Sequence, residues 1–187
     1  MTTADPPLAA PRPGGQTSPV PLLVVMGVSG SGKTTVGRAL AERLGVPFAD
    51  ADDFHGEANI AKMTAGVALQ DADRLPWLRR VGAWLAGQAG GGVVTCSALR
   101  RRYRDVLREQ VPDALFVHLD GDREVVRRRV ARRRGHFMPV TLVDSQYAAL
   151  EPLGPDENGV VLDFSREAGR LVEDFLAATG RENRQKG

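Results

Sequence analysis

The stretch Gly27-Val28-Ser29-Gly30-Ser31-Gly32-Lys33-Thr34 decides the fold of this chain, because it fits the pattern G-x-x-x-x-G-K-[ST]. The residues before it, Leu22–Met26, form a continuous apolar run that is typical of a buried strand. The residues after it, Lys33–Leu44, carry apolar side chains at helical spacing and precede Gly45, which favours a helix end. A strand, a glycine-rich loop and a helix in this order predict a phosphate-binding loop.

The chemistry of such a loop favours a nucleoside triphosphate as its ligand. Its glycines let backbone N–H groups turn toward phosphate oxygens, and the following helix adds its positive N-terminal end. Lys33 places a positive charge on the β- and γ-phosphates, and the Thr34 hydroxyl can hold Mg²⁺. We therefore expect ATP and Mg²⁺ here, with nucleotide contacts from Gly27, Ser29, Gly30, Ser31, Gly32, Lys33, Thr34 and Thr35.

Short apolar runs alternate with helical patterns along the rest of the chain. The predicted strands are Leu22–Met26, Val46–Asp50, Val93–Cys96, Leu115–Leu119 and Val160–Leu162. The further predicted helices begin at Pro76, after Ser97, after Asp122, near Val140 and after Ser165. This alternation predicts an α/β fold of three layers, in which helices cover both faces of a central parallel sheet of five strands. Ligands of such folds bind at the carboxyl ends of the strands.

The length and composition indicate one globular domain with two polar ends. The chain has 187 residues, of which 42% are hydrophobic and 26% are charged. Residues 1–19 are rich in proline and are predicted to be a disordered tail. We expect the folded domain to span residues 20–179 and a flexible C-terminal tail to span residues 180–187.

Charge, hydropathy and cysteine content exclude several classes of protein. The 25 basic and 23 acidic residues nearly balance, which argues against a nucleic-acid partner. No apolar run reaches the length of a membrane span, and the N-terminus lacks the apolar stretch of a secretory signal. Cys96 is the only cysteine, so a disulfide framework is excluded. We expect a cytoplasmic protein that acts on a small molecule.

Two carboxylates follow the second predicted strand, at Asp50 and Asp52. In a parallel sheet this strand end lies opposite the phosphate loop. One carboxylate can hold a water molecule of the Mg²⁺ shell, and the other can accept the proton of an attacking hydroxyl group. Asp53 is a third candidate for these roles. A solvated acidic turn and a contact with a nucleotide ribose are the alternatives for this cluster.

An arginine-rich segment late in the chain is a candidate for a lid over the nucleotide. Arg129 and Arg133 are spaced i, i+4, so both can face ATP and neutralise the charge on the transferring phosphoryl group. The alternative is a basic helix whose side chains are solvated. His136 follows Gly135 and is expected at the hinge of this segment, near the substrate.

The motifs that are absent narrow the class of enzyme. The base-reading tetrapeptide Asn-Lys-x-Asp of GTPases does not occur, and no apolar strand ends in the aspartate of a standard Walker B element. A small-molecule kinase fits better than a GTPase or a motor ATPase. A shikimate or nucleoside kinase, and a nucleotide-binding regulator without catalysis, remain alternatives.

Longer blocks of the sequence resemble one family. From Gly27 to Asp52 the chain resembles P-loop kinases of the shikimate-kinase-like group. The following blocks are similar to those of gluconokinases: Asp50-Ala-Asp-Asp-Phe-His55, Asn59-Ile-Ala-Lys-Met63, Asp71-x-Asp-Arg-x-Pro-Trp-Leu78, Cys96-Ser-Ala-Leu99, Tyr103-Arg-Asp105 and Arg134-Gly-His-Phe137. The resemblance implies a kinase that transfers phosphate from ATP to the 6-hydroxyl group of D-gluconate, and it also implies a homodimer.

The resemblance also implies roles for individual residues. Asp52 would be the catalytic base or a carboxylate that orients the substrate, and Asp50 would support Mg²⁺. The loop chemistry and the lid spacing described above add Thr34 to the Mg²⁺ site and assign Lys33 and Arg129 to the phosphoryl oxygens. The residues expected to position the sugar acid are Asp52, His55, Lys62, Arg104 and His136. The guanidinium of Arg104 offers a bidentate fork that matches the carboxylate of gluconate.

Overall fold

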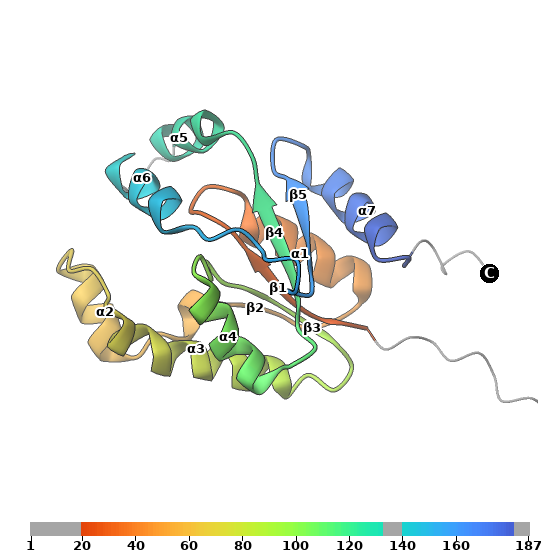
Figure 1. Cartoon of the computed structure of the whole chain (residues 1–187), viewed down its shortest axis with the longest axis horizontal. Helices are drawn as coiled ribbons and strands as arrows, with labels where there is room; N and C mark the ends of the chain where they lie inside the picture. The colour runs from red at the N-terminus through yellow and green to blue at the C-terminus, as the bar shows by residue number, and fades with distance from the viewer. Residues whose placement is uncertain (1–19, 133–139, 182–187) are drawn as a thin grey trace, which may run out of the picture.

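A five-stranded parallel sheet forms the centre of the computed structural model, which describes residues 20–132 and 140–181 (Figure 1). The predictions for the tail over residues 1–19, for residues 182–187, and for Arg133 and His136 lie outside the described residues. The strand order is β2-β3-β1-β4-β5, and every pairing is parallel, which confirms the predicted fold class. The strands are β1 Leu22–Met26, β2 Phe48–Asp50, β3 Gly92–Thr95, β4 Leu115–Asp120 and β5 Gly159–Asp163.

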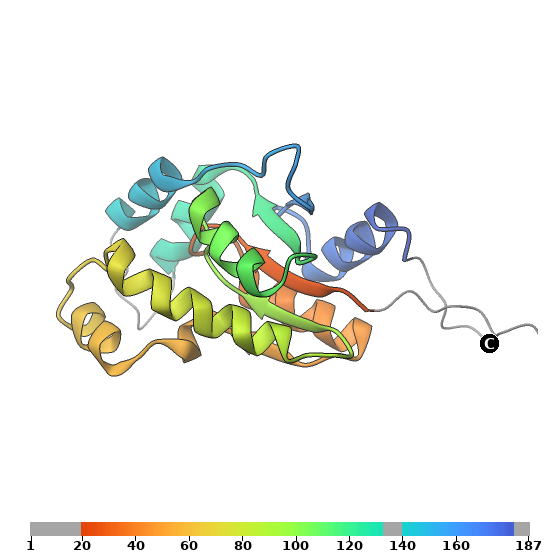
Figure 2. The same ribbon diagram turned by 60° about the horizontal axis from the view of Figure 1, so that its bottom comes forward.

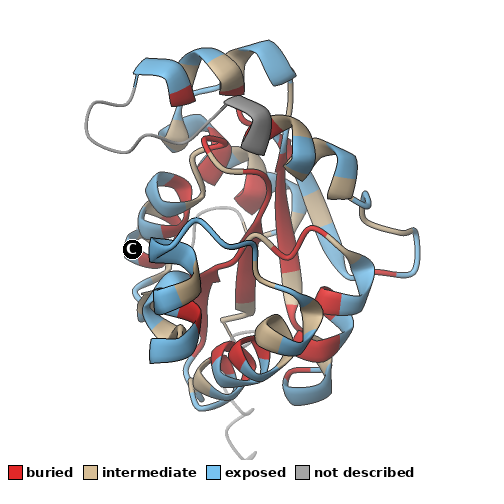
Figure 3. Cartoon of the chain, turned by 90° about the vertical axis from the view of Figure 1, so that its left-hand side faces the viewer, coloured by how far each residue is buried: buried red, intermediate tan, exposed pale blue. Residues whose placement is uncertain are grey.

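Helices cover both faces of this sheet (Figures 1 and 2). The helices are α1 Lys33–Leu44, α2 Glu57–Thr64, α3 Asp71–Ala86, α4 Arg101–Gln110, α5 Arg123–Arg132, α6 Val140–Ala149 and α7 Ala168–Ala178, with a short 3₁₀ helix η1 at Ala51–Phe54. Leu23 and Val25 of β1 pack in the core under α1 and α7, whereas Val24 and Met26 pack in the core under α3 and α4. Buried residues therefore gather on the strands and on the inner faces of the helices (Figure 3). Within the described residues, no helix has the length and apolar character needed to cross a membrane.

The sheet topology brings the phosphate loop next to the end of β2. After β1 the chain moves to the edge strand β2, and β3 then fills the position between them. Thr95 of β3 is in register with both Val25 of β1 and Asp50 of β2. The carboxyl ends of these three strands consequently meet at one edge, which is where ligands bind in folds of this kind.

The structure confirms two of the predicted helix boundaries. Gly45 ends α1 in the left-handed conformation, at φ 66°. Asp122 caps α5, because its Oδ1 accepts the backbone N–H of Glu124 at 2.8 Å.

Three predicted helix starts were wrong. Pro76 lies inside α3, which begins five residues earlier, after Gln70; the Gln70 side chain and the Asp73 carboxylate cap each other's backbone N–H groups. Helix α4 begins at Arg101 rather than after Ser97. Helix α7 begins at Ala168, and Ser165 instead donates its N–H to the Asp163 carboxylate at 2.8 Å in the preceding turn. In both serine cases a segment of several residues separates the strand from the helix.

Candidate active site

The phosphate loop has the backbone geometry that its glycines predict. Gly30 and Gly32 have φ angles of 84° and 96°, in the region that favours glycine. A Cβ on Gly30 would also lie 2.9 Å from Val130 Cγ2 of α5, so this position needs both the conformational freedom and the small size of glycine. Gly32 precedes the first residue of α1 and has no side chain to cap it, which leaves the first N–H groups of the helix for a phosphate.

Hydrogen bonds hold the polar side chains of Lys33, Thr34 and Asp50 in place beside this loop. Lys33 Nζ donates to the carbonyl of Val28 at 3.0 Å, which holds the ammonium group over the loop. The Thr34 hydroxyl donates to Asp50 Oδ2 at 3.1 Å, and Asp50 Oδ1 accepts the N–H of Asp52 at 3.1 Å. A hydroxyl and a carboxylate are the hard oxygen ligands that Mg²⁺ prefers, so Thr34 and Asp50 fit the predicted metal role.

A cavity of about 500 Å³ opens on one side of the loop, and we call it the nucleotide pocket. The residues that line it are Gly30, Ser31, Gly32, Thr35, Val36, Arg129, Arg132, Phe164, Arg166, Glu167, Ala168 and Leu171. Arg129 therefore lies where a nucleotide contact was predicted. Its Nη2 donates to the carbonyl of Phe164 at 3.0 Å, and its guanidinium lies 5.5 Å from the centre of the Phe164 ring. The contact of Arg129 with the transferring phosphoryl group stays a prediction.

A second cavity, of about 360 Å³, lies against η1, α3, α4 and α6, and we call it the acceptor pocket. The residues that line it are Asp52, His55, Ala68, Leu69, Arg74, Trp77, Leu78, Ser97, Ala98, Leu99, Arg100, Tyr103, Ser145, Gln146 and Ala149. Its size is within the range of pockets for small metabolites. Carboxylate, imidazole, guanidinium, phenol and amide groups meet in it, as recognition of a hydroxylated acid requires.

Asp52 lines the acceptor pocket, and contacts of the two residues before it in the chain hold it there. Asp50 caps η1 from one side, and the indole Nε1 of Trp77 donates to the carbonyl of Ala51 at 2.6 Å. The Asp52 carboxylate itself is exposed to solvent. Partial desolvation, together with the negative charge of Asp50, raises the pKa of Asp52, while His55 and Lys33 act in the opposite direction. A raised pKa makes a carboxylate a better proton acceptor.

His55 is fixed beside Asp52 in one orientation. Its ring stacks on Trp77, with the ring centres 4.4 Å apart, and its side chain is only 4% exposed. The amide Nδ2 of Asn59 lies 3.2 Å from His55 Nδ1 and must donate to it, which leaves the ring proton on Nε2. His55 Nε2 lies 3.8 Å from Asp52 Oδ1. Burial lowers the pKa of His55, which favours the neutral ring as a hydrogen-bond donor toward Asp52 or the substrate.

Lys62 and Asp53 lie near this group without lining the acceptor pocket. Lys62 Nζ pairs with the Asp73 carboxylate at 2.6 Å, at the capped start of α3. Its predicted contact with the sugar acid stays a prediction. Asp53 is exposed on η1, one residue beyond Asp52.

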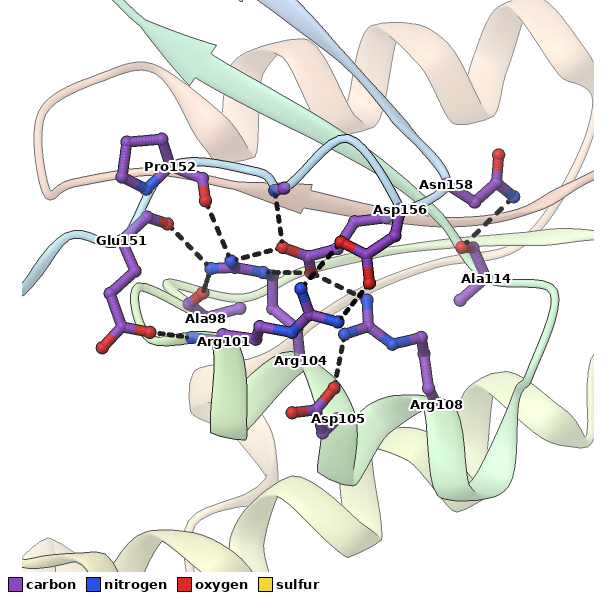
Figure 4. Close-up of polar contacts among 12 residues, drawn as sticks. Ala98, Arg101, Arg104, Asp105, Arg108, Ala114, Glu151, Pro152, Asp156 and Asn158 are labelled. Atoms are coloured by element: carbon purple, nitrogen blue, oxygen red, sulfur yellow. Dashed lines mark hydrogen bonds and ion pairs between the residues drawn. The ribbon is translucent and has the colours of Figure 1, made fainter.

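The prediction that Arg104 binds the substrate was wrong (Figure 4). Its side chain is completely buried, and Nε and Nη2 donate to the two carboxylate oxygens of Glu157, each at 2.7 Å. The other donors of the guanidinium reach the backbone carbonyls of Ala98, Leu99, Glu151 and Pro152. Because every direction of the fork is used, Arg104 holds the segment before β5 against α4 and has no donor for a ligand.

The acceptor pocket contains a cation that the sequence reasoning missed, Arg74. Its Nη1 donates to the Tyr103 hydroxyl at 3.0 Å, and that hydroxyl donates to the Asp71 carboxylate at 2.7 Å. Arg100 also lines the pocket. Arg74 follows Asp73 in one of the gluconokinase-like blocks, so the sequence carried a signal for it. The signal did not distinguish a pocket residue from a helix-surface residue.

The sequence and the fold both match known small-molecule kinases. The family model described as Shikimate kinase matches residues 29–152, a range that includes every residue lining the acceptor pocket. The thermosensitive gluconokinase of Escherichia coli (strain K12) is 44% identical over 159 residues, which is 83% of this chain and 85% of that protein. The gluconokinase of Gluconobacter oxydans (strain 621H) is 46% identical over 157 residues, which is 82% of this chain and 88% of that protein.

A solved structure shows the same fold at similar identity. The crystal structure of a gluconokinase from Sinorhizobium meliloti 1021 superposes with a TM-score of 0.78 at 44% sequence identity. The match covers 87% of this chain and 93% of that one.

Proposed function

We propose that this chain, which belongs to the gluconokinase family of shikimate-kinase-like P-loop kinases, transfers the γ-phosphoryl group of ATP to D-gluconate. The reaction would phosphorylate the 6-hydroxyl group and give 6-phospho-D-gluconate and ADP. The observation that carries this proposal is the position of Asp52. It lines a pocket built for a hydroxylated acid and is bonded, through Asp50, to Thr34 of the phosphate loop.

The proposed chemistry is an in-line transfer. The Asp52 carboxylate accepts the proton of the 6-hydroxyl group as the hydroxyl oxygen bonds to the γ-phosphorus. The bond between this phosphorus and the oxygen that bridges to the β-phosphate breaks, and its electrons stay with ADP. Lys33 and the N–H groups of the loop stabilise the charge on the phosphoryl oxygens. Mg²⁺ held near Thr34 and Asp50 would supply further neutralisation of the phosphate charge.

We assign recognition of the gluconate carboxylate to Arg74 and Arg100 instead of Arg104. Both lie in the wall of the acceptor pocket, and Arg74 is oriented by its bond to Tyr103. His55 presents an N–H donor near Asp52, where a substrate hydroxyl would approach. Lys62 is a candidate for a further contact from α2.

An ADP-release assay with Mg·ATP tests the function directly. The acceptors compared are D-gluconate, shikimate, a nucleoside monophosphate and none. Turnover with gluconate alone is the expected result. Turnover with another acceptor would support a kinase with a different substrate. The absence of turnover with every acceptor would favour a nucleotide-binding regulator.

We also propose that the chain acts in the cytoplasm as a homodimer. The family resemblance supports the dimer, and the use of ATP with a single cysteine supports a reducing compartment. Light scattering coupled to a sizing column tests the dimer, and a strict monomer would contradict it.

A further inference from the structure

A glutamine of α6 binds the phosphate loop directly. Gln146 Oε1 accepts the backbone N–H of Ser29 at 2.6 Å, and Gln146 Nε2 donates to Ser29 Oγ at 3.0 Å. The two residues are 117 positions apart in the chain. The amide therefore pairs with the backbone N–H and with the hydroxyl oxygen of Ser29, and this double contact orients the serine.

The same glutamine belongs to the wall of the acceptor pocket. Gln146 lines that pocket with its neighbour Ser145, whereas loop residues Gly30–Gly32 line the nucleotide pocket on the other side. Ser29 lines neither pocket but directly precedes Gly30 in the loop. The Gln146–Ser29 pair thus links the wall of the acceptor pocket to the loop that lines the nucleotide pocket.

The position of α6 does not depend on this link alone. Asp144, two residues earlier, accepts hydrogen bonds from Arg127 Nη2 of α5 at 2.7 and 2.8 Å and is also paired with Arg123. Val143 is completely buried in the core. Loss of the Gln146 amide would therefore leave α6 in place while freeing Ser29.

We propose that Gln146 is a positioning residue that couples the acceptor site to the nucleotide site. An acceptor bound against Gln146 restricts its amide, and the amide holds Ser29 in the loop conformation that binds the phosphates. By thermodynamic reciprocity ATP strengthens acceptor binding by the same factor. The coupled acceptor is taken to be D-gluconate, so this inference rests on the proposed function.

The test measures the coupling itself. The Kd of a non-hydrolysable ATP analogue with Mg²⁺ is measured by calorimetry with and without saturating D-gluconate, in the wild type and in Gln146→Leu. Leucine has a similar volume and removes both hydrogen bonds. Gluconate is expected to tighten the wild-type Kd by about fivefold or more, and that of Gln146→Leu by less than about twofold. The Kd of the analogue alone is expected to rise in Gln146→Leu as well, because Ser29 is freed, so the coupling is taken from the ratio of the two Kd values of each protein.

Two further variants make the result specific. Ser29→Ala removes only the bond from Nε2 and is expected to retain part of the coupling. Gln88→Leu makes the same chemical change at the opposite end of the sheet, where the Gln88 side chain donates to the Trp84 carbonyl, and this variant should show the same coupling as the wild type.

The failure of this inference is distinguishable from the failure of the proposed function. If Gln146→Leu shows the same coupling as the wild type, the role of Gln146 is overturned and the proposed function stands. The same conclusion follows if the wild type binds gluconate but shows no coupling. A wild type that does not bind gluconate would overturn the proposed function and the coupling to that acceptor together.

Discussion

Asp52 owes its position to groups that do not touch the reacting atoms. Trp77 fixes the carbonyl before it, Asp50 binds its N–H group, and His55 faces its carboxylate. Asn59 in turn binds both His55 Nδ1 and the carbonyl of Asp73, so its amide connects η1 to the start of α3. The short 3₁₀ helix that carries the proposed base, with His55 at its end, is thereby held by three different elements.

Asp52→Asn is expected to lower kcat by about 100-fold or more, because general-base catalysis typically contributes 10² to 10⁴. The asparagine keeps the size of the side chain and removes its ability to accept the proton. Steady-state kinetics with gluconate and Mg·ATP measure the loss. Asp53→Asn is the matched comparison at the neighbouring position. If it lowers kcat by this amount while Asp52→Asn stays active, Asp53 is the base.

Arg74→Met is expected to raise the KM for gluconate by about 10- to 100-fold with a smaller effect on the KM for ATP. Hydrogen bonds to charged groups contribute about 1.5–3 kcal/mol, which corresponds to that range. Arg79→Met on the same helix is the matched control, because Arg79 is half-exposed and its only ion pair, with Glu109, is 3.8 Å long. If the KM for gluconate is unchanged in Arg74→Met, the contact with the gluconate carboxylate is to be assigned to Arg100 or Lys62 instead.

Arg104→Met is expected to act on stability. It removes both hydrogen bonds that Arg104 donates to the buried Glu157 carboxylate and leaves Glu157 with Arg108 and the Gly154 N–H as donors. Breaking a buried ion pair typically costs about 3–5 kcal/mol. Urea denaturation measures the free energy of unfolding, and the KM for gluconate of the remaining folded protein should stay near the wild-type value. If Arg104→Met instead raises the KM for gluconate strongly and leaves the free energy of unfolding unchanged, Arg104 binds the substrate after all.

At the scale of elements, the predictable features are those whose signal is local. The loop with its flanking strand and helix, the end of α1 at Gly45 and the Asp122 cap each depend on a few adjacent residues, and the structure confirms them. The start of α3 was missed because glutamine is a weak signal for a cap and Pro76 a strong one for a first turn. The Gln70–Asp73 reciprocal cap places the helix start earlier and leaves the proline inside.

The 3₁₀ helix η1 depends on Trp77 of α3 for its position. Trp77→Phe retains an aromatic ring beside His55 but leaves the Ala51 carbonyl without its donor, which costs about 1–3 kcal/mol for a buried group. We expect kcat to fall by about tenfold, because small displacements of a catalytic group reduce the rate. Trp84→Phe, which keeps the aromatic contact with Phe54 of η1, is the control and should retain nearly full kcat. Equal losses in both variants would show that α3 packing in general, not the indole N–H, positions η1.

At the scale of the whole molecule, the features that sequence reasoning missed are long-range pairs. Arg104 and Glu157 are 53 residues apart, and Gln146 and Ser29 are 117 apart. The sequence of a family-like block looks the same whether its arginine faces a pocket or a buried carboxylate. Only the packing of the segment before β5 against α4 decides between these roles for Arg104 (Figure 4).

The Arg104–Glu157 cluster also predicts how stability depends on pH. The Arg104 guanidinium, with further donors from Gly154 and Arg108, holds the pKa of Glu157 far below its ordinary value of 4.5, and Arg101 lowers the pKa of Asp156 from 3.8 to about 2. The unfolded chain therefore binds more protons than the folded one below about pH 5, and stability falls as the pH decreases. Their stabilising contribution is fully present above the unfolded pKa values and is lost as the pH falls toward the folded ones.

Glu157→Gln is expected to remove the part of this dependence that Glu157 contributes, while lowering stability at neutral pH. Each of these groups contributes a slope of at most about 1.4 kcal/mol per pH unit, so the wild type should lose stability steadily as the pH falls from about 5 to about 2. The glutamine cannot titrate, and its curve should be flatter by the slope of one group. Glu109→Gln, at an exposed and long ion pair, is the matched control and should run parallel to the wild type. Parallel curves for the wild type and Glu157→Gln would mean that other carboxylates govern acid unfolding, and that the buried pair is not what joins the segment before β5 to the rest of the fold.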